Sequence, residues 1–213
     1  MGDITALARE QAQKQIIQGQ TLIDQIQIKM KKVVDEFAAG EISREQFQKI
    51  YEHYQAQIVL AAQMMMDADS LATMEPTAGE TMAIRKGLTA KAKAMTVYYH
   101  ATGLLLETIG DFDVPVALIS PTLNNIGAQV TAGSKVDTRV EKFNNEWLLY
   151  MPGKYSTSVM LLSHEPAARQ IGIMESMHRD FEGANDNILK SGQADGGALV
   201  YPFQAIVRRS VTK

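Results

Sequence analysis

Four histidines are the side chains in this sequence best suited to acid–base or metal chemistry: His53, His100, His164 and His178. No two of them have the His-x-x-x-His spacing that places two metal ligands on one helix face, so we predict no metal site. The pair His164-Glu165 stands where a helix is expected to begin, and an acid there is favoured by the helix dipole. We therefore interpret this pair as a helix start rather than a catalytic dyad. His178 falls on an expected apolar helix face and is predicted to be a core or interface residue.

Other signatures of catalysis are missing from the sequence. The absence of cysteine excludes a thiol nucleophile, a cysteine zinc site and a disulfide framework. The chain has no Gly-x-Ser-x-Gly, Walker loop or dinucleotide glycine motif. Asp111 and Asp113 have loop spacing, but a calcium loop needs several more oxygen ligands. We predict a protein that is not an enzyme and has no cofactor, with an enzyme using His164, Glu165 or the two aspartates as an alternative.

The overall composition indicates a folded protein and argues against two kinds of partner, nucleic acid and a membrane interior. Apolar residues make up 46% of the 213 positions and charged residues 21%, with a net charge of -3. The pI of about 5.8 argues against nucleic-acid binding. No stretch approaches the ~18 apolar residues of a membrane span. Because the amino terminus lacks the pattern of a secretory signal, we expect a cytoplasmic location.

Glutamine and proline are distributed unevenly along the chain. Twelve of the sixteen glutamines lie in residues 1–63, whereas all six prolines lie beyond residue 75. Proline inside a helix costs ~3 kcal/mol and glutamine is a good helix former, so the first third is predicted to be helical. We expect two domains, a helical hairpin over residues 1–75 and a second domain over residues 76–213.

Two helices are predicted in the first domain, over residues 4–38 and from Ser43 onward. Gly40 suits the left-handed cap of the first helix, and Ser43 with Gln46 has the spacing of a capping box. Apolar residues recur at alternating spacings of 3 and 4, as in a heptad repeat. The one spacing of 7 arises because Gly19 stands at the heptad position where an apolar residue would be expected. They are predicted to form the helix–helix and subunit contacts: Ile16, Ile23, Ile26, Met30, Val33, Phe37, Phe47, Tyr51, Tyr54, Ile58 and Met65. The turn over residues 35–47 resembles short helical hairpins found at bacterial protein termini, and that resemblance implies oligomerisation or tethering.

The second domain is predicted to be α+β, with an antiparallel sheet flanked by helices. Helical spacing predicts a helix over residues 80–109, and two short apolar runs predict strands over 114–120 and 126–130. A hairpin of strands is expected over 147–151 and 155–162, joined by a type II turn at Pro152-Gly153. Ser156 and Ser158 predict that one face of its second strand is less buried. A helix is expected from Glu165, and an edge strand over 198–209.

This order of elements resembles the roadblock and dynein-light-chain family, which has a profilin-like sheet. The residues that carry the resemblance are 114–129 and 150–181, above all the segment 163–174. The crossover after Val130 is short for the family's middle helix, and residues 198–209 add an element. Membership would imply homodimerisation and the regulation of, or scaffolding for, a small GTPase.

We therefore predict a non-enzymatic, oligomerising scaffold or regulatory adaptor, most simply a homodimer. The alternative is a ligand-sensing module of PAS or GAF type with a helical signalling arm. That alternative predicts a cavity at the sheet, lined by Trp147, Tyr150, Tyr155 and Met160.

Overall fold

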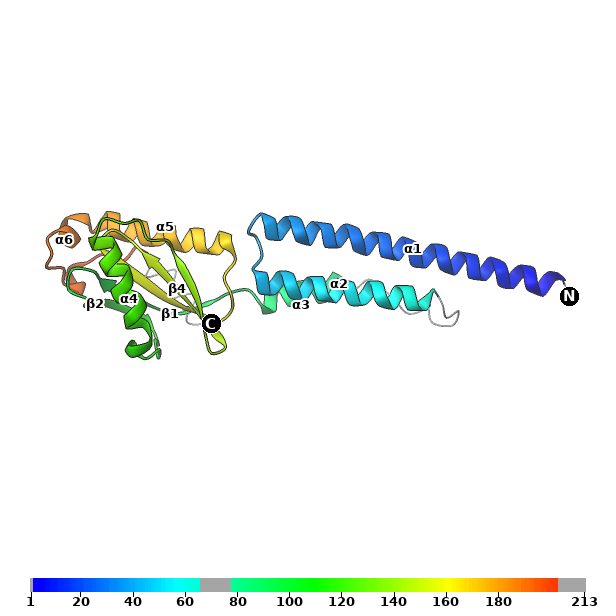
Figure 1. The fold of residues 1–213 in the computed structure, drawn as a ribbon, viewed down its shortest axis with the longest axis horizontal. Coiled ribbons are helices and arrows are strands. Elements are labelled where there is room, and N and C mark those ends of the chain that lie inside the picture. The colour runs from blue at the N-terminus through cyan, green and yellow to red at the C-terminus, as the bar shows by residue number, and fades with distance from the viewer. Residues whose placement is uncertain (1, 66–77, 203–213) are drawn as a thin grey trace. The chain divides into compact units, whose positions relative to one another are not determined.

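The computed structural model describes residues 2–65 and 78–202 (Figure 1). The chain divides into two compact units, Met1–Leu88 and Thr89–Lys213. The sequence places the boundary near residue 75, whereas the structure places it after Leu88. The reason is a short helix, α3 (Ala78–Gly87), which packs on the helical hairpin and so belongs to the first unit.

The helical hairpin consists of α1 (Gly2–Ala38) and α2 (Arg44–Met64). The predicted capping box is present, because the Gln46 amide donates to Ser43 Oγ over 3.2 Å and the Ser43 amide donates to Gln46 Oε1 over 2.9 Å. The predicted left-handed glycine is also present, with φ of 71° at Gly40. The Gln46 side chain donates to the Arg85 carbonyl over 2.9 Å, which ties α3 to the start of α2.

Apolar side chains of both long helices form the core of this unit. Ile26 and Val33 of α1 are buried together with Ile50 and Tyr54 of α2. Ile26, Val33 and Tyr54 are predicted positions, whereas Ile50 is not among them. The pairing is that expected for antiparallel neighbours joined by a short loop.

The second unit is built on a five-stranded antiparallel sheet with the strand order β2-β1-β5-β4-β3. The strands are β1 (Ala92–Tyr99), β2 (Leu105–Gly110), β3 (Arg139–Phe143), β4 (Glu146–Pro152) and β5 (Ser156–Leu162). The helices are α4 (Val116–Thr131), α5 (Ala168–Ala184) and α6 (Asp186–Lys190), followed by the 3₁₀ helix η2 (Gly196–Ala198). The α+β fold class predicted from the sequence is confirmed.

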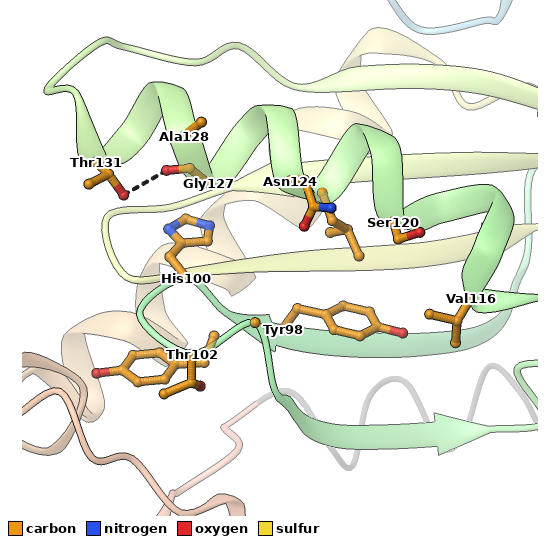
Figure 2. Close-up of a pocket in the computed structure, with 12 residues that line it drawn as sticks. Tyr98, His100, Thr102, Val116, Ser120, Asn124, Gly127, Ala128 and Thr131 are labelled. Carbon is orange, nitrogen blue, oxygen red and sulfur yellow. Dashed lines mark hydrogen bonds between the residues drawn. The ribbon is translucent and has the colours of Figure 1, made fainter.

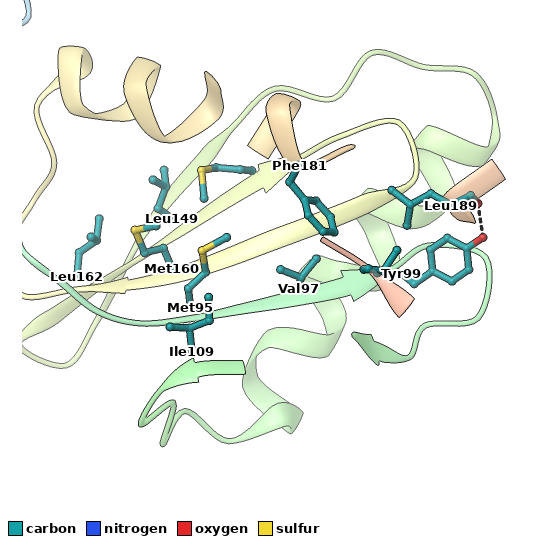
Figure 3. Packing of buried hydrophobic residues seen from close by; sticks show 11 residues of the cluster. Met95, Val97, Tyr99, Ile109, Leu149, Met160, Leu162, Phe181 and Leu189 are labelled. Carbon is teal, nitrogen blue, oxygen red and sulfur yellow. Dashed lines mark hydrogen bonds between the residues drawn. The ribbon is translucent and has the colours of Figure 1, made fainter. Parts of the chain in front are cut away.

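Each face of this sheet carries its own core. One face packs against α5 and α6 through a cluster that includes Met95, Met160, Phe181 and Leu189 (Figure 3). The other face packs against α4 through Ile119 and Ile126, among others. The central strand β5 is buried along its whole length because helices cover both of its faces.

The predicted helix over residues 80–109 is wrong. Only residues 78–87 are helical, and β1 and β2 follow as a hairpin whose turn contains Gly103 at φ of 70°. β1 is buried on both faces over six of its eight residues, so it lacks the polar–apolar alternation that marks a strand with one exposed face. The spacing of apolar residues in this segment was therefore misinterpreted as helical.

The predicted strands over residues 114–120 and 126–130 are also wrong, because this segment forms α4. Its buried residues Ile119 and Ile126 lie with Leu123 and Val130 at spacings of 4, 3 and 4, which is a helical period. Pro121 lies inside the helix, where it removes one backbone hydrogen bond. Packing of this apolar stripe on the sheet compensates for that loss.

The predicted hairpin of β4 and β5 is confirmed, and its register pairs Trp147 with Leu162 and Pro152 with Thr157. The predicted type II turn is wrong, because Gly153 does not have the positive φ that such a turn needs at this position. Ser156 and Ser158 are fully buried, which contradicts the prediction of a less buried face. The strand β3, which pairs with β4, was missed in the sequence.

The end of the second unit departs from the prediction in detail. α5 begins at Ala168, after His164 and Glu165, so these residues do not form its first turn. Residues 198–202 do not form a strand, and the rest of the predicted strand over 198–209 lies outside the described residues. None of the helices within the described ranges has the length and apolarity needed to cross a bilayer.

Candidate functional site

Glu182, near the end of α5, accepts four hydrogen bonds from described residues of the second unit. Its carboxylate accepts hydrogen bonds from three successive backbone amides of the β4–β5 turn, those of Lys154 (2.7 Å), Tyr155 (2.9 Å) and Ser156 (2.8 Å). The Ser156 hydroxyl donates a fourth bond over 2.8 Å. Successive backbone amides pointing at one anion form a nest, so Glu182 fastens the turn to α5.

Gly153 precedes these amides and leaves room for the carboxylate. A Cβ atom at this position would collide with the carboxyl group of Glu182. The glycine that the sequence suggested for a positive φ is instead needed for a close side-chain approach. Its own amide donates to the Ser156 carbonyl over 2.8 Å and closes the turn.

His178 lies one helical turn before Glu182 and is almost completely buried. Its Nδ1 lies 2.7 Å from the Ser158 hydroxyl, its Nε2 lies 3.3 Å from the Ser156 carbonyl, and Glu182 Oε1 is 3.8 Å away. Burial lowers the pKa of His178, against a smaller opposing effect of Glu182. The serine, histidine and glutamate resemble a triad in composition, but Ser158 is fully buried and beyond reach of a substrate. This group therefore has a structural role, consistent with the predicted core position of His178.

His100, directly after β1, lies on the opposite face of the sheet. Its Nε2 is 2.7 Å from the Thr157 hydroxyl, and Nδ1 is buried with no hydrogen-bond partner among the described residues. Burial lowers the pKa of His100, and the nearby Glu182 carboxylate only partly opposes this effect. The imidazole is therefore neutral at pH 7.

A cavity of about 410 Å³ lies between the end of β1 and α4 (Figure 2). Its β1 side is formed by Tyr98, Tyr99, His100, Thr102 and Gly103, and its α4 side by Val116, Ser120, Leu123, Asn124, Gly127, Ala128 and Thr131. This volume is within the ~300–1,000 Å³ of ordinary small-molecule sites. The cavity is the candidate functional site of this unit.

The chemistry of this cavity is polar but uncharged. Lysine, arginine, aspartate and glutamate are all absent from its lining. Burial raises the pKa of Tyr98, so its hydroxyl keeps its proton at neutral pH. Across the described parts of the chain, no group of three histidine or acidic side chains could hold a metal ion. The cavity can offer hydrogen bonds and aromatic surface but no strong charge.

The four residues predicted to line a sensor cavity are not brought together, and this is a correction to that prediction. Tyr150 is buried on the α4 face of the sheet, whereas Trp147, Tyr155 and Met160 belong to the packed cluster on the α5 face. Neighbours along a strand alternate between faces, so residues 147 and 150 point to opposite sides. None of the four lines the observed cavity.

The residues predicted to form interfaces in the hairpin fall into two groups. Ile26, Val33 and Tyr54 are buried in the hairpin itself, with Met30, Phe47 and Ile58 packed around them. Phe37 stacks on Phe47 with ring centroids 4.8 Å apart, and Phe47 stacks on Tyr51 at 5.4 Å. Ile23 is half-buried, and Met65 packs on Gly19, where a Cβ would collide with its side chain. Ile16 and Phe37 remain exposed, by 45% and 40%.

The α4 side of the cavity carries a signal that the sequence reading missed. Ser120, Asn124, Gly127, Ala128 and Thr131 recur at spacings of 4, 3, 1 and 3, which places small and polar residues on one helix face. The buried isoleucines occupy the adjacent face. Had residues 116–131 been assigned as a helix, this stripe would have indicated a hollow beside the sheet.

Fold and site together define an α+β protein with a helical hairpin and a cavity on one face of its sheet. Comparisons of the chain with protein-family models, with curated proteins and with solved structures found no match.

Proposed function

We propose that this protein is an oligomerising scaffold or regulatory adaptor in which the helical hairpin joins two copies of the chain. The observation that carries the proposal is the unequal length of the two helices. α1 has 37 residues and α2 has 21 (Figure 1). Gly19 of α1 lies against Met65, the residue that caps the C-terminal end of α2. The first half of α1 therefore continues past the end of α2.

Among the described residues, α2 covers only the second half of α1. Most helical stability in proteins comes from packing, so apolar side chains on the part of α1 that α2 does not cover favour a further partner. In this extension Ile16 and Ile17 are 45% and 57% exposed, and Ile16 lies one heptad before Ile23 of the hairpin seam. The apolar pattern thus extends beyond the part of α1 that α2 covers.

A second copy of the chain suits this extension as its partner. Residues 2–18 contain two acidic and two basic residues, so two such segments meet without net repulsion. Further apolar side chains of the hairpin are exposed and could widen the contact: Ile28, Val34, Phe37, Val59 and Leu60.

Burial of Ile16 and Ile17 at such a contact would contribute enough free energy to stabilise a dimer. Complete burial of an isoleucine contributes about 1.5–3 kcal/mol, so a half-exposed one contributes roughly 1 kcal/mol. Ile16 and Ile17 from two copies together contribute about 4 kcal/mol, which corresponds to roughly a thousandfold in Kd.

The test is the oligomeric state of the full chain, measured by light scattering and sedimentation. The variant Ile16→Gln/Ile17→Gln is expected to raise the dimer Kd by at least about a hundredfold. Ile173→Gln is the matched control, because Ile173 of α5 is also 57% exposed but lies in the other unit. A wild-type chain that stays monomeric at about 100 μM, or a double variant that dimerises like the control, would overturn the proposal.

A small GTPase is the candidate protein partner, as the family resemblance implies. The order of elements after residue 92, namely two strands, a helix, three strands and a helix, is compatible with this proposal. Full-length protein immobilised on a resin is expected to retain a GTPase whose binding differs between its GDP and GTP-analogue forms. Equal retention of both forms, or none of either, would count against regulation of a GTPase.

A further inference from the structure

We propose that the cavity between β1 and α4 binds an uncharged, planar heterocycle of nucleobase to nucleoside size. This inference goes beyond the proposed assembly function and does not require it, because every residue of the site lies in the second unit. The volume of about 410 Å³ suits a ligand of that size, with space left for water.

The β1 side of the cavity provides flat aromatic surface. Tyr98 and His100 are two positions apart, so both side chains lie on the face of the sheet that α4 covers (Figure 2). Aromatic rings favour stacked or edge-on contacts with other rings, which a planar heterocycle can satisfy. The Nε2···Oγ1 contact of 2.7 Å with Thr157 holds the His100 ring in place.

The α4 side provides hydrogen bonds and space. The Ser120 hydroxyl and the Asn124 amide lie one helical turn apart and together offer donors and acceptors. Further along, Gly127 has no atom within 4 Å of the position where a Cβ would stand, so the helix leaves open volume there. Thr131 is satisfied within the helix, since its hydroxyl donates to the Gly127 carbonyl over 2.8 Å.

The electrostatics of the lining select an uncharged ligand. No cationic side chain is present to pair with a phosphate or carboxylate, and no acidic one to pair with an ammonium group. His100 stays neutral at pH 7 because burial lowers its pKa. A phosphate added to the ligand would gain nothing from this site.

The experiment measures binding of adenosine, guanosine and nicotinamide to the full chain by calorimetry and by NMR line broadening. The blocking variant is Gly127→Leu, which directs a side chain into the cavity and is compatible with a helix. Gly172→Leu is the matched control, because Gly172 also lies in a helix with open space around it but is outside the cavity. Asn124→Ala serves as a second variant if Gly127→Leu fails to fold.

We expect at least one of the three probes to bind with a Kd of roughly 10 μM to 1 mM, the range set by so small a ligand. Gly127→Leu should weaken that binding by about tenfold or more, Asn124→Ala by at least about threefold, and Gly172→Leu should leave it unchanged. Adenosine 5′-monophosphate should bind no more tightly than adenosine. The proposal is overturned if no probe binds at about 5 mM, if Gly127→Leu binds like wild type, or if the monophosphate binds tenfold more tightly.

Discussion

Removal of the Glu182 carboxylate should strongly destabilise the second unit. The carboxylate accepts bonds from the amides of Lys154, Tyr155 and Ser156 and from the Ser156 hydroxyl. Glu182→Ala leaves these four donors without their acceptor. Lys154 is exposed and can bond to water, whereas Ser156 is fully buried and cannot.

The expected cost follows from the donors that water cannot reach. Hydrogen bonds to a charged group contribute ~1.5–3 kcal/mol each, and two of the four belong to buried Ser156. The free energy of unfolding should fall by about 3–6 kcal/mol, a large share of the ~5–15 kcal/mol of a typical domain. Glu182→Gln keeps one acceptor oxygen and should lose only about 1–3 kcal/mol.

The assay is urea and thermal unfolding of the full chain, followed by circular dichroism. Asp180→Ala on the same helix is the control, because Asp180 is exposed, and it should change stability by less than about 0.5 kcal/mol. Glu182→Ala matching this control would refute the reasoning.

A second measurement isolates the contact between Glu182 and Gly153. Gly153→Ala should destabilise the wild-type chain because the new Cβ meets the carboxyl group. In the Glu182→Ala background that collision is gone, so the same change should cost at least about 1 kcal/mol less. Additive effects of the two changes would show that the close approach does not matter to stability.

Three further outcomes are expected. Burial lowers the pKa of His178 and of His100, so both are neutral when folded while the unfolded chain protonates near 6.5. The stability they contribute is complete above about pH 6.5 and is lost as the pH falls below it, by up to ~1.4 kcal/mol per pH unit for each histidine. Denaturation from pH 7.5 to 5 checks this slope, which His178→Gln should roughly halve, and a flat profile would contradict it. Ser43→Ala removes the capping box and should destabilise the hairpin by ~0.5–2 kcal/mol in urea titrations. A urea midpoint of unfolding equal to that of the wild type would contradict this prediction. Gly19→Leu crowds the Met65 side chain and should cost ~1–3 kcal/mol despite better helix propensity, and an increased melting temperature would disprove the close contact.

Local signals in the sequence were sufficient for the helical hairpin. The capping box at Ser43, the left-handed Gly40 and the heptad spacing of Ile26 and Val33 each depend on neighbours within one or two helical turns. Such interactions operate in nearly any tertiary environment, so residue type and spacing were enough to predict them. The β4–β5 hairpin was predictable for the same reason.

The first two strands and α4 were not predictable in this way. β1 is covered on both faces, which removes its alternation, and α4 has an apolar, β-branched sequence interrupted by Pro121. For short apolar runs the periods of helix and strand are hard to separate, and packing decides between them. Because the cavity lies between these two misassigned elements, the sequence prediction placed it at the wrong residues.

The sequence by itself therefore determined the α+β class, the hairpin with its caps and the absence of recognised catalytic motifs. Tertiary structure alone decided which polar residues meet. The Glu182 carboxylate reaches a turn nearly thirty residues away, and Tyr98 comes to face Asn124 across the cavity. Contacts of this kind depend on which elements pack on which face of the sheet, and that is set by burial of the whole core rather than by local spacing.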